Sequence, residues 1–230
     1  MTPTDTEIAN ESVDLLSQLI RNECVNDGTP ESGFESRSVD LLAQYLGDTG
    51  LDLERYVAQP GRENLVARIE GSDPTAPTLL LMGHTDVVPA NPDGWRRDPF
   101  GGEVVDGEVW GRGAVDMLNL TATMAVAFRA LARTGFRPRG TLVYLAVADE
   151  ENLGTWGAEH LLDHEHDAVK ADYVVTGRAA SRCRVRAVLA FPSSWARRVR
   201  IGAVSRCGEH RVTRRNRSAP TTRWSRPPRS

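Results

Sequence analysis

The chain has 230 residues, of which 40% are hydrophobic and 26% charged, and its formal net charge is −3. These are ordinary values for a globular protein, and the length allows one large domain or two small ones. No run of about 18 to 20 apolar residues is present, which excludes a helical membrane span. The start lacks a basic and an apolar region, and the three cysteines form no CxxC pair. We therefore expect a cytoplasmic protein.

Helical and strand patterns alternate along the first 177 residues. Apolar residues at helical spacing predict helices, and short apolar or alternating runs predict strands. The predicted helices are 8–22, 35–46, 120–131 and 155–162, and the predicted strands are 64–69, 78–82, 103–109, 141–148 and 172–176. An Asp-Gly pair at 106–107 predicts a hairpin turn inside the third strand. The interleaving predicts an α/β fold with a sheet flanked by helices.

The tripeptide His84-Thr85-Asp86 follows the second predicted strand. Alternation places His84 and Asp86 on one side of the chain, where Asp86 can accept a hydrogen bond from the imidazole. Such a contact fixes the tautomer of a metal-binding histidine. The alternative is a histidine that is bonded in a strand-end turn for structural reasons.

Two acidic groups lie at other junctions of the predicted elements. Asp116 follows a flexible WGRGAV segment and precedes a helix, so it could cap that helix or bridge two cations. The run Asp149-Glu150-Glu151 follows the strand TLVYLAVA. Three adjacent carboxylates repel one another, and either a cation or a solvated loop removes that cost.

These three groups are expected at one edge of the sheet, because sites in α/β folds gather at the carboxyl ends of strands. One histidine with several carboxylates forms a nitrogen and oxygen ligand set that suits zinc, manganese or cobalt. A two-metal centre needs a bridging carboxylate, terminal His and Glu ligands, and a further Glu as base. The sequence therefore predicts a hydrolytic metal centre.

The strings GHTDVVP and GWRRDPFGGEVVDGEVWGRGAVDM, followed by the Glu150-Glu151 pair and GTWGAEHL, resemble the co-catalytic di-zinc amidohydrolases and peptidases. That family includes acetylornithine deacetylase, succinyl-diaminopimelate desuccinylase, aminoacylase and the glutamate carboxypeptidases. The resemblance covers residues 1 to about 176. It implies a zinc-peptidase-like catalytic domain with a mixed sheet, and a small-molecule or peptide amide as substrate.

The resemblance also implies the roles of five residues. His84 is a ligand of one metal ion and is oriented by Asp86. Asp116 bridges two divalent ions, for which zinc is the first candidate and cobalt or manganese are the others. Glu150 is the general base, and Glu151 is a ligand of the second ion.

Several departures from the family pattern accompany this resemblance. The Asp116–Met117 peptide is expected to be cis, but Leu118 and Asn119 follow where many relatives have lysine and glycine. Gly177 stands where the family has another acidic ligand. A lid or dimerisation domain and a distal histidine ligand are also expected to be missing, although the family is often homodimeric. Each ion would keep two protein ligands, so we expect impaired activity.

A sharp change in charge separates residues 1–177 from residues 178–230. The first part has 13 basic and 30 acidic side chains, a net charge of −17, and the second has 15 arginines and one glutamate, a net charge of +14. Reading the codons after residue 177 one base out of frame can restore a family-like continuation, with Glu in place of Gly177. We therefore expect an out-of-frame, disordered tail. The alternatives are a nucleic-acid-binding arm that uses the arginines with Trp195 and Trp224, or an inactive remnant.

The remaining histidines of the acidic part are His160, His164 and His166, in the segment AEHLLDHEHDAV. Their pattern is compatible with metal binding, but no predicted ligand loop adjoins them. A solvated helix end is the expectation.

Overall fold

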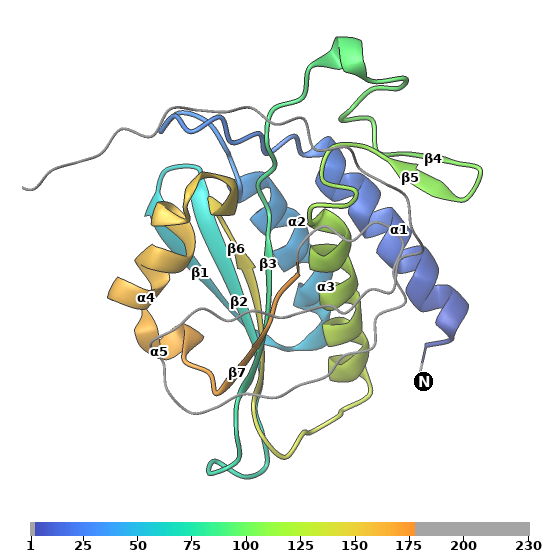
Figure 1. The fold of residues 1–230 in the computed structure, drawn as a ribbon. Coiled ribbons are helices and arrows are strands. Elements are labelled where there is room, and N and C mark those ends of the chain that lie inside the picture. Colours follow the sequence, from blue (N-terminus) through green and yellow to red (C-terminus); the bar gives the residue numbers. More distant parts are fainter. Residues whose placement is uncertain (1–2, 178–230) are drawn as a thin grey trace, which may run out of the picture.

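The computed structural model describes residues 3–177 and contains a five-stranded mixed sheet in the order β1-β2-β6-β3-β7 (Figure 1). Its strands are β1 (Asp52–Gln59), β2 (Arg62–Ile69), β3 (Leu79–His84), β6 (Leu142–Val147) and β7 (Tyr173–Val175). β2 is antiparallel to both β1 and β6, whereas β3 is parallel to both β6 and β7. A separate hairpin joins β4 (Glu103–Val105) to β5 (Glu108–Trp110). The parallel part brings the carboxyl ends of β3, β6 and β7 to one edge.

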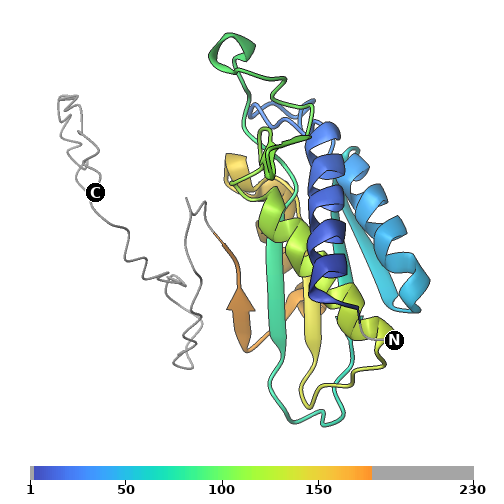
Figure 2. The same cartoon turned by 90° about the vertical axis from the view of Figure 1, so that its right-hand side faces the viewer.

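Helices cover both faces of this sheet, as Figures 1 and 2 show. On one face lie α1 (Asp5–Arg21), α2 (Ser36–Leu46) and α3 (Leu118–Arg133), and on the other lie α4 (His160–His164) and α5 (His166–Val169). The shorter helices are η1 (Gly47–Thr49), η2 (Pro92–Gly94), η3 (Glu150–Asn152) and the π-helix η4 (Thr155–Glu159). The mixed sheet flanked by helices confirms the predicted fold class.

Strand β6 is buried on both faces, and its side chains alternate between two apolar clusters. Leu142, Tyr144 and Ala146 pack in the cluster that includes α1, α2 and α3. Val143, Leu145 and Val147 pack in the cluster that includes Leu161 and Val169. A strand covered on both sides reads as a continuous apolar run, which explains why the sequence identifies it so clearly.

The structure differs from the predicted elements at three places. The four-residue helix α5 was not predicted. β1 was not predicted either, because it is a partly exposed edge strand whose sequence DLERYVAQ mixes charged and apolar residues. The predicted helix over 155–162 is instead a π-helix with a kink at Gly157, followed by α4. A Cβ at Gly157 would lie 1.9 Å from the carbonyl oxygen of Ala148, so this close approach requires glycine.

The predicted arginine-rich tail, residues 178–230, lies outside the described residues, so the boundary at residue 177 stays a prediction. Among the helices of residues 3–177, none is long and apolar enough to cross a membrane.

Candidate metal centre

The end of β3 presents His84 at the edge where the parallel strands finish. His84 pairs with Val147 of β6 in the sheet. The carbonyl oxygen of His84 accepts a hydrogen bond from the Thr121 hydroxyl of α3 at 2.7 Å. Helix α3 can approach this closely because Gly83 has no side chain: a Cβ there would lie 2.5 Å from Thr121 Oγ1. The position of His84 is therefore fixed by both the strand and the helix.

His84, Asp116 and Glu151 converge at this edge, although they come from three separate segments. One potential ligand atom from each lies within 4.8 Å of the others, and no other group of three such residues is found in the described part of the chain. His84 Nε2 lies 3.4 Å from Asp116 Oδ1 and 3.7 Å from Glu150 Oε2. The imidazole is 2% exposed, whereas the side chains of Asp116 and Glu150 are 53% and 58% exposed. The cluster is therefore open to solvent on its carboxylate side.

The imidazole of His84 is oriented by the backbone of Asp86. Nδ1 lies 2.8 Å from the Asp86 carbonyl oxygen and 3.5 Å from its carboxylate, so Asp86 accepts a hydrogen bond from the imidazole, as predicted, through its backbone. A carbonyl oxygen can only accept, so Nδ1 must carry the proton of this hydrogen bond. In the neutral ring, the lone pair is then on Nε2 and faces Asp116. This is the tautomer that a metal ligand requires.

The carboxylate of Asp86 instead holds the turn that follows β6. Its Oδ1 accepts the backbone N–H of Glu150 and its Oδ2 that of Glu151, both at 3.1 Å. Oδ2 also accepts a hydrogen bond from the Asn26 side chain at 2.8 Å. Asp86 therefore joins the loop after β3 to the acidic turn after β6.

The carboxylates around His84 alter its pKa and that of Glu151. Burial lowers the pKa of His84, but the nearby Asp86 carboxylate, the charge of Glu150 and the hydrogen bond to the Asp86 carbonyl raise it to about 9. The pKa of Glu151 is raised by burial and by the nearby charges of Asp116, Asp86 and Glu150. A bound cation would relieve this crowding of negative charge. The nitrogen and oxygen donors that are present fit a divalent ion of the zinc type.

Asp116 lies on the loop between β5 and α3, and the Asp116–Met117 peptide bond is cis, as the resemblance predicts. Met117 is the N-cap residue of α3, and no side chain caps this helix end. The helix-capping alternative for Asp116 is therefore wrong.

The three residues of the turn Asp149-Glu150-Glu151 differ in solvent exposure. Asp149 is buried and has a left-handed backbone (φ 62°), while Glu150 is exposed and Glu151 is half-buried. Asp149 accepts hydrogen bonds from the Asn26 side chain at 2.9 Å and from the Trp156 backbone at 3.1 Å. The alternative of a solvated loop thus fails for Asp149. The sequence interpretation did not identify Asn26, because a single asparagine in a loop carries no distinguishing pattern.

Gly177 lies beyond the carboxyl end of β7, against the first turn of α3. A Cβ at this position would lie 2.0 Å from Leu120 Cδ1 and 3.5 Å from Cε of Met117, the residue that follows Asp116. A side chain at position 177 would therefore emerge beside the loop that carries Asp116.

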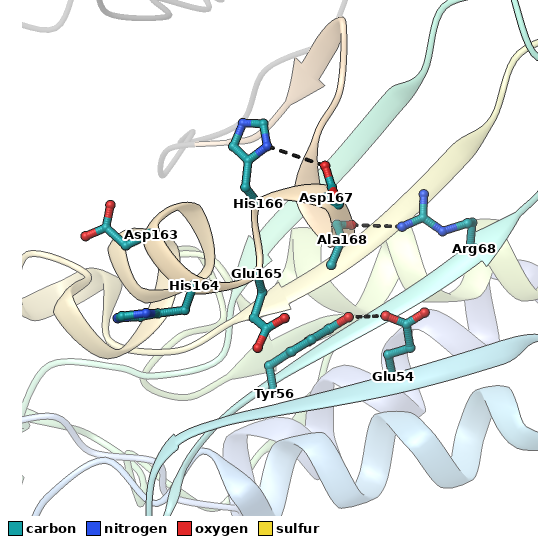
Figure 3. A pocket seen from close by; sticks show the side chains of 9 residues that line it. All are labelled: Glu54, Tyr56, Arg68, Asp163, His164, Glu165, His166, Asp167 and Ala168. Carbon is teal, nitrogen blue, oxygen red and sulfur yellow. Dashed lines mark hydrogen bonds and ion pairs between the residues drawn. The ribbon is translucent and has the colours of Figure 1, made fainter.

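The other three histidines of the described part lie elsewhere. His160 and His164 have ring centroids 4.8 Å apart on α4, and His164 and His166 line an open pocket of about 500 Å³ (Figure 3). Its other lining residues, which include Glu54, Tyr56 and Arg68, come from β1, β2 and the α4–α5 region. This pocket does not include His84, Asp116 or Glu151. Both His164 and His166 are exposed, in agreement with the expected solvated helix end.

Comparison with known proteins gives consistent results. Residues 80–222 match the model of peptidase family M20/M25/M40. Succinyl-diaminopimelate desuccinylase of Methylobacterium nodulans is 46% identical over 134 residues, which are 56% of this chain and 33% of that protein. The enzyme of the same name from Methylocella silvestris is 32% identical over 183 residues, which are 77% of this chain and 45% of that protein. The chain thus spans less than half the length of these curated relatives.

Solved structures share the fold. Human carnosine dipeptidase 1 is 27% identical, with a TM-score of 0.53, over 72% of this chain and 37% of the dipeptidase. An M20 family metallo-carboxypeptidase from Sulfolobus solfataricus is 20% identical, with a TM-score of 0.58, over 72% of this chain and 36% of its own. The matched family model covers more than half of the sequence and includes the three converging residues. This chain therefore belongs to peptidase family M20/M25/M40.

Proposed function

We propose that this chain is part of a metal-dependent hydrolase that cleaves the amide bond of an N-acyl amino acid or a small peptide. The observation that carries the proposal is the convergence of His84, Asp116 and Glu151 within 4.8 Å, with Glu150 beside them. The names of the relatives, a desuccinylase and a dipeptidase, both indicate amide hydrolysis. We also propose a cytoplasmic location, because three cysteines without a CxxC pair suit a reducing compartment.

In this proposal, His84 Nε2 and the carboxylates of Asp116 and Glu151 would hold two divalent ions, with zinc as the first candidate and cobalt or manganese as alternatives. Asp116 would serve both ions, because both its oxygens can be ligands. When bound, such ions polarise a substrate carbonyl and lower the pKa of a water molecule.

Glu150 is proposed as the general base. Its carboxylate is more than half exposed and lies 3.7 Å from His84, so both a substrate and a water molecule can reach it. It takes a proton from the attacking water as the bond to the carbonyl carbon forms. It then gives that proton to the leaving amine as the amide bond breaks.

We propose that metal binding by this chain is weakened, because Gly177 stands where the resemblance expects a further carboxylate. Among the described residues the cluster has three potential ligand residues, so two ions would have Asp116 with His84 and Asp116 with Glu151. Two ligands per ion are fewer than the three or four that protein zinc sites use. Two tightly held zinc ions per purified chain would contradict this point.

We further propose that residues 178–230 are encoded out of frame. The support is the change from a net charge of −17 to +14 at this point. Resequencing the gene around codon 177 tests it, and the expected result is one additional base there, which turns Gly177 into Glu and restores the frame. A related gene that encodes the same arginine-rich tail in a clean reading frame would contradict it.

The decisive test of the proposed function is a titration with Zn²⁺ or Co²⁺ against a competing chelator. His84→Ala and Glu151→Gln are expected to weaken binding at least tenfold. His160→Ala, at a histidine outside the cluster, serves as the matched control and is expected to change nothing. Equal binding by the wild type and His84→Ala would refute the site.

A second measurement separates binding from chemistry. A panel of N-acyl amino acids and dipeptides is incubated with the metal-loaded protein, and the released amine is measured. Glu150→Gln is expected to abolish any hydrolysis while the metal content stays unchanged. Residual activity at the wild-type rate in Glu150→Gln would remove Glu150 from the role of base.

A further inference from the structure

An ion pair is buried directly behind the acidic turn. Arg62 Nη1 lies 2.7 Å from Glu35 Oε1, and the two side chains are 1% and 0% exposed. Burying two charged groups is costly, and an ion pair recovers that cost only when further hydrogen bonds satisfy both partners. Arg62 Nε and Glu35 Oε2 have no hydrogen-bond partner, but the other polar atoms of the two side chains bond to the loop between α1 and α2 and to the acidic turn.

The guanidinium of Arg62 holds the loop between α1 and α2. Its Nη2 donates to the carbonyl oxygen of Thr29 at 3.0 Å, to Ser32 Oγ at 3.3 Å and to Asn26 Oδ1 at 3.4 Å. The contact with Asn26 Oδ1 orients the side-chain amide of Asn26, whose nitrogen donates to Asp86 and Asp149. This loop is therefore fixed from inside by a single side chain.

Both partners of the ion pair also reach the acidic turn. Glu35 Oε1 accepts the backbone N–H of Asp149 at 3.2 Å, and Arg62 Nη1 lies 3.7 Å from the Asp149 carboxylate. The Asn26 amide, held by Arg62, donates to Asp149 at 2.9 Å and to Asp86 at 2.8 Å. Asp149 is thus contacted by Glu35, Arg62 and Asn26 together.

The turn needs such support because of its backbone. Asp149 has φ 62°, a left-handed conformation that costs a non-glycine residue energy and persists only where the surroundings impose it. The next two backbone N–H groups, of Glu150 and Glu151, point to Asp86. The conformation of Asp149 therefore decides where the side chains of Glu150 and Glu151 emerge.

The close packing around the pair excludes any side chain at Gly33. A Cβ there would lie 2.1 Å from Arg62 Nη1 and 2.6 Å from Glu35 Oε2, and Gly33 has φ 91°. The backbone of the loop thus approaches the ion pair too closely for any other residue. The loop is shaped to enclose the pair.

We propose that Glu35 and Arg62 are positioning residues, which hold Asp149 so that Glu150 and Glu151 face His84 and Asp116. Neither residue touches the substrate. The proposal rests on the proposed function for the roles of Glu150 and Glu151, but the positioning itself is a property of the metal-free protein.

The test compares Arg62→Met, Glu35→Leu and the double variant. At a pH above the pKa of Glu35, each single variant leaves one buried charge without its partner, so a lower Tm is expected, whereas the double variant removes both charges and recovers most of the Tm. If the ion pair is purely structural, amide exchange in the acidic turn and Zn²⁺ affinity should recover together with the Tm. If the pair positions the turn, both should stay altered although the Tm recovers.

The first readout is amide hydrogen exchange without metal. In the double variant, the amides of Glu150 and Glu151 are expected to exchange at least tenfold faster than in the wild type, while those of β6 stay protected. Removing the Arg129–Glu11 ion pair, which packs away from the turn with 3.2 Å between charged atoms, is the matched control. Wild-type exchange at Glu150 and Glu151 in a folded double variant would overturn the proposal.

A conservative variant keeps the test decisive if the double variant fails to fold. Glu35→Gln retains an oxygen that can accept the Asp149 N–H, so its exchange at Glu150 and Glu151 is expected within threefold of the wild type. Glu35→Leu has no acceptor and is expected to exchange much faster. Equal exchange in these two single variants would also overturn the proposal.

The second readout is Zn²⁺ affinity, which is expected to fall at least tenfold in the double variant. If the wild type itself binds no Zn²⁺, the proposed function fails, but the exchange data still decide whether Glu35 and Arg62 position the turn.

Discussion

The buried carboxylate of Asp86 accepts the backbone N–H of Glu151 at 3.1 Å, across 65 positions of the chain. The same carboxylate accepts the Glu150 N–H through its other oxygen, while the Asp86 carbonyl bonds the imidazole of His84. Asp86 therefore sets the relative position of the proposed base and of two proposed ligands. A change at Asp86 should affect all three at once.

Asp86→Asn provides the first prediction. In the wild type, each carboxylate oxygen of Asp86 accepts one backbone N–H, from Glu150 or Glu151. The asparagine side chain has only one oxygen, so its NH₂ group would face one of these N–H donors without forming a hydrogen bond. We expect Zn²⁺ binding to weaken about 10- to 100-fold, and the free energy of unfolding to fall by about 1 to 3 kcal/mol. Chelator competition and urea denaturation measure the two effects.

The second prediction concerns the contact between β3 and α3. Gly83→Ala places a Cβ 2.5 Å from Thr121 Oγ1, the hydroxyl that bonds the carbonyl of His84. We expect α3 to shift and the free energy of unfolding to fall by about 1 to 3 kcal/mol, with weaker Zn²⁺ binding. Gly47→Ala is the control, because a Cβ there meets nothing within 4 Å. Equal stability of the two variants would show that this contact is not tight.

The third prediction concerns pH. Burial first, and then the charge of Asp86, raise the pKa of Glu35 from 4.5 to about 7, against the opposing effect of Arg62. Between these values the folded protein holds a proton that the unfolded chain has released. Stability from Glu35 is therefore complete below pH 4.5 and is lost as pH rises to 7, by about 3 kcal/mol in all.

The check on this pH dependence is Glu35→Gln, whose side chain does not titrate. The free energy of unfolding of the wild type should fall more steeply from pH 4.5 to 7 than that of the variant. Parallel curves would mean that the Glu35 pKa is not raised.

The fourth prediction concerns Gly177. Gly177→Glu places a carboxylate beside the Asp116 loop and should tighten Zn²⁺ binding at least tenfold. Leu120 must change rotamer, since its Cδ1 lies 2.0 Å from the new Cβ. Gly177→Gln requires the same rearrangement without adding a charge, and we expect no gain from it. If the two variants bind Zn²⁺ equally well, position 177 contributes no ligand.

The alternation of helices and strands was predictable from the sequence because each buried element has a clear apolar period. Strand β6 is apolar throughout and is covered on both faces, so its place in the sheet is unambiguous. β1 was not predicted, because an edge strand can carry charged residues such as Glu54 and Arg55 among its apolar ones. The kink at Gly157 depends on the carbonyl of Ala148, which no local pattern reveals.

The cluster of His84, Asp116 and Glu151 could be anticipated because each follows or precedes a recognisable element, and parallel strands bring such ends together. Glu35 and Arg62 could not be anticipated. A charged residue in a sequence is normally expected on the surface, and these two are buried only because tertiary packing brings them together. Asp86 was correctly predicted to accept a hydrogen bond from His84, but the sequence does not show which Asp86 oxygen accepts it, and in the structure this is the backbone carbonyl.

The three converging residues are separated by 32 and 35 positions, so no short segment contains the site. A pair of ions that shares these three residues can bind only after β3, α3 and β6 have associated. It would then stabilise the folded chain by about 2.7 kcal/mol at a hundredfold excess over its Kd. A Zn²⁺-dependent rise in Tm would therefore report the association of β3, α3 and β6, and the metal would act as a probe of native topology.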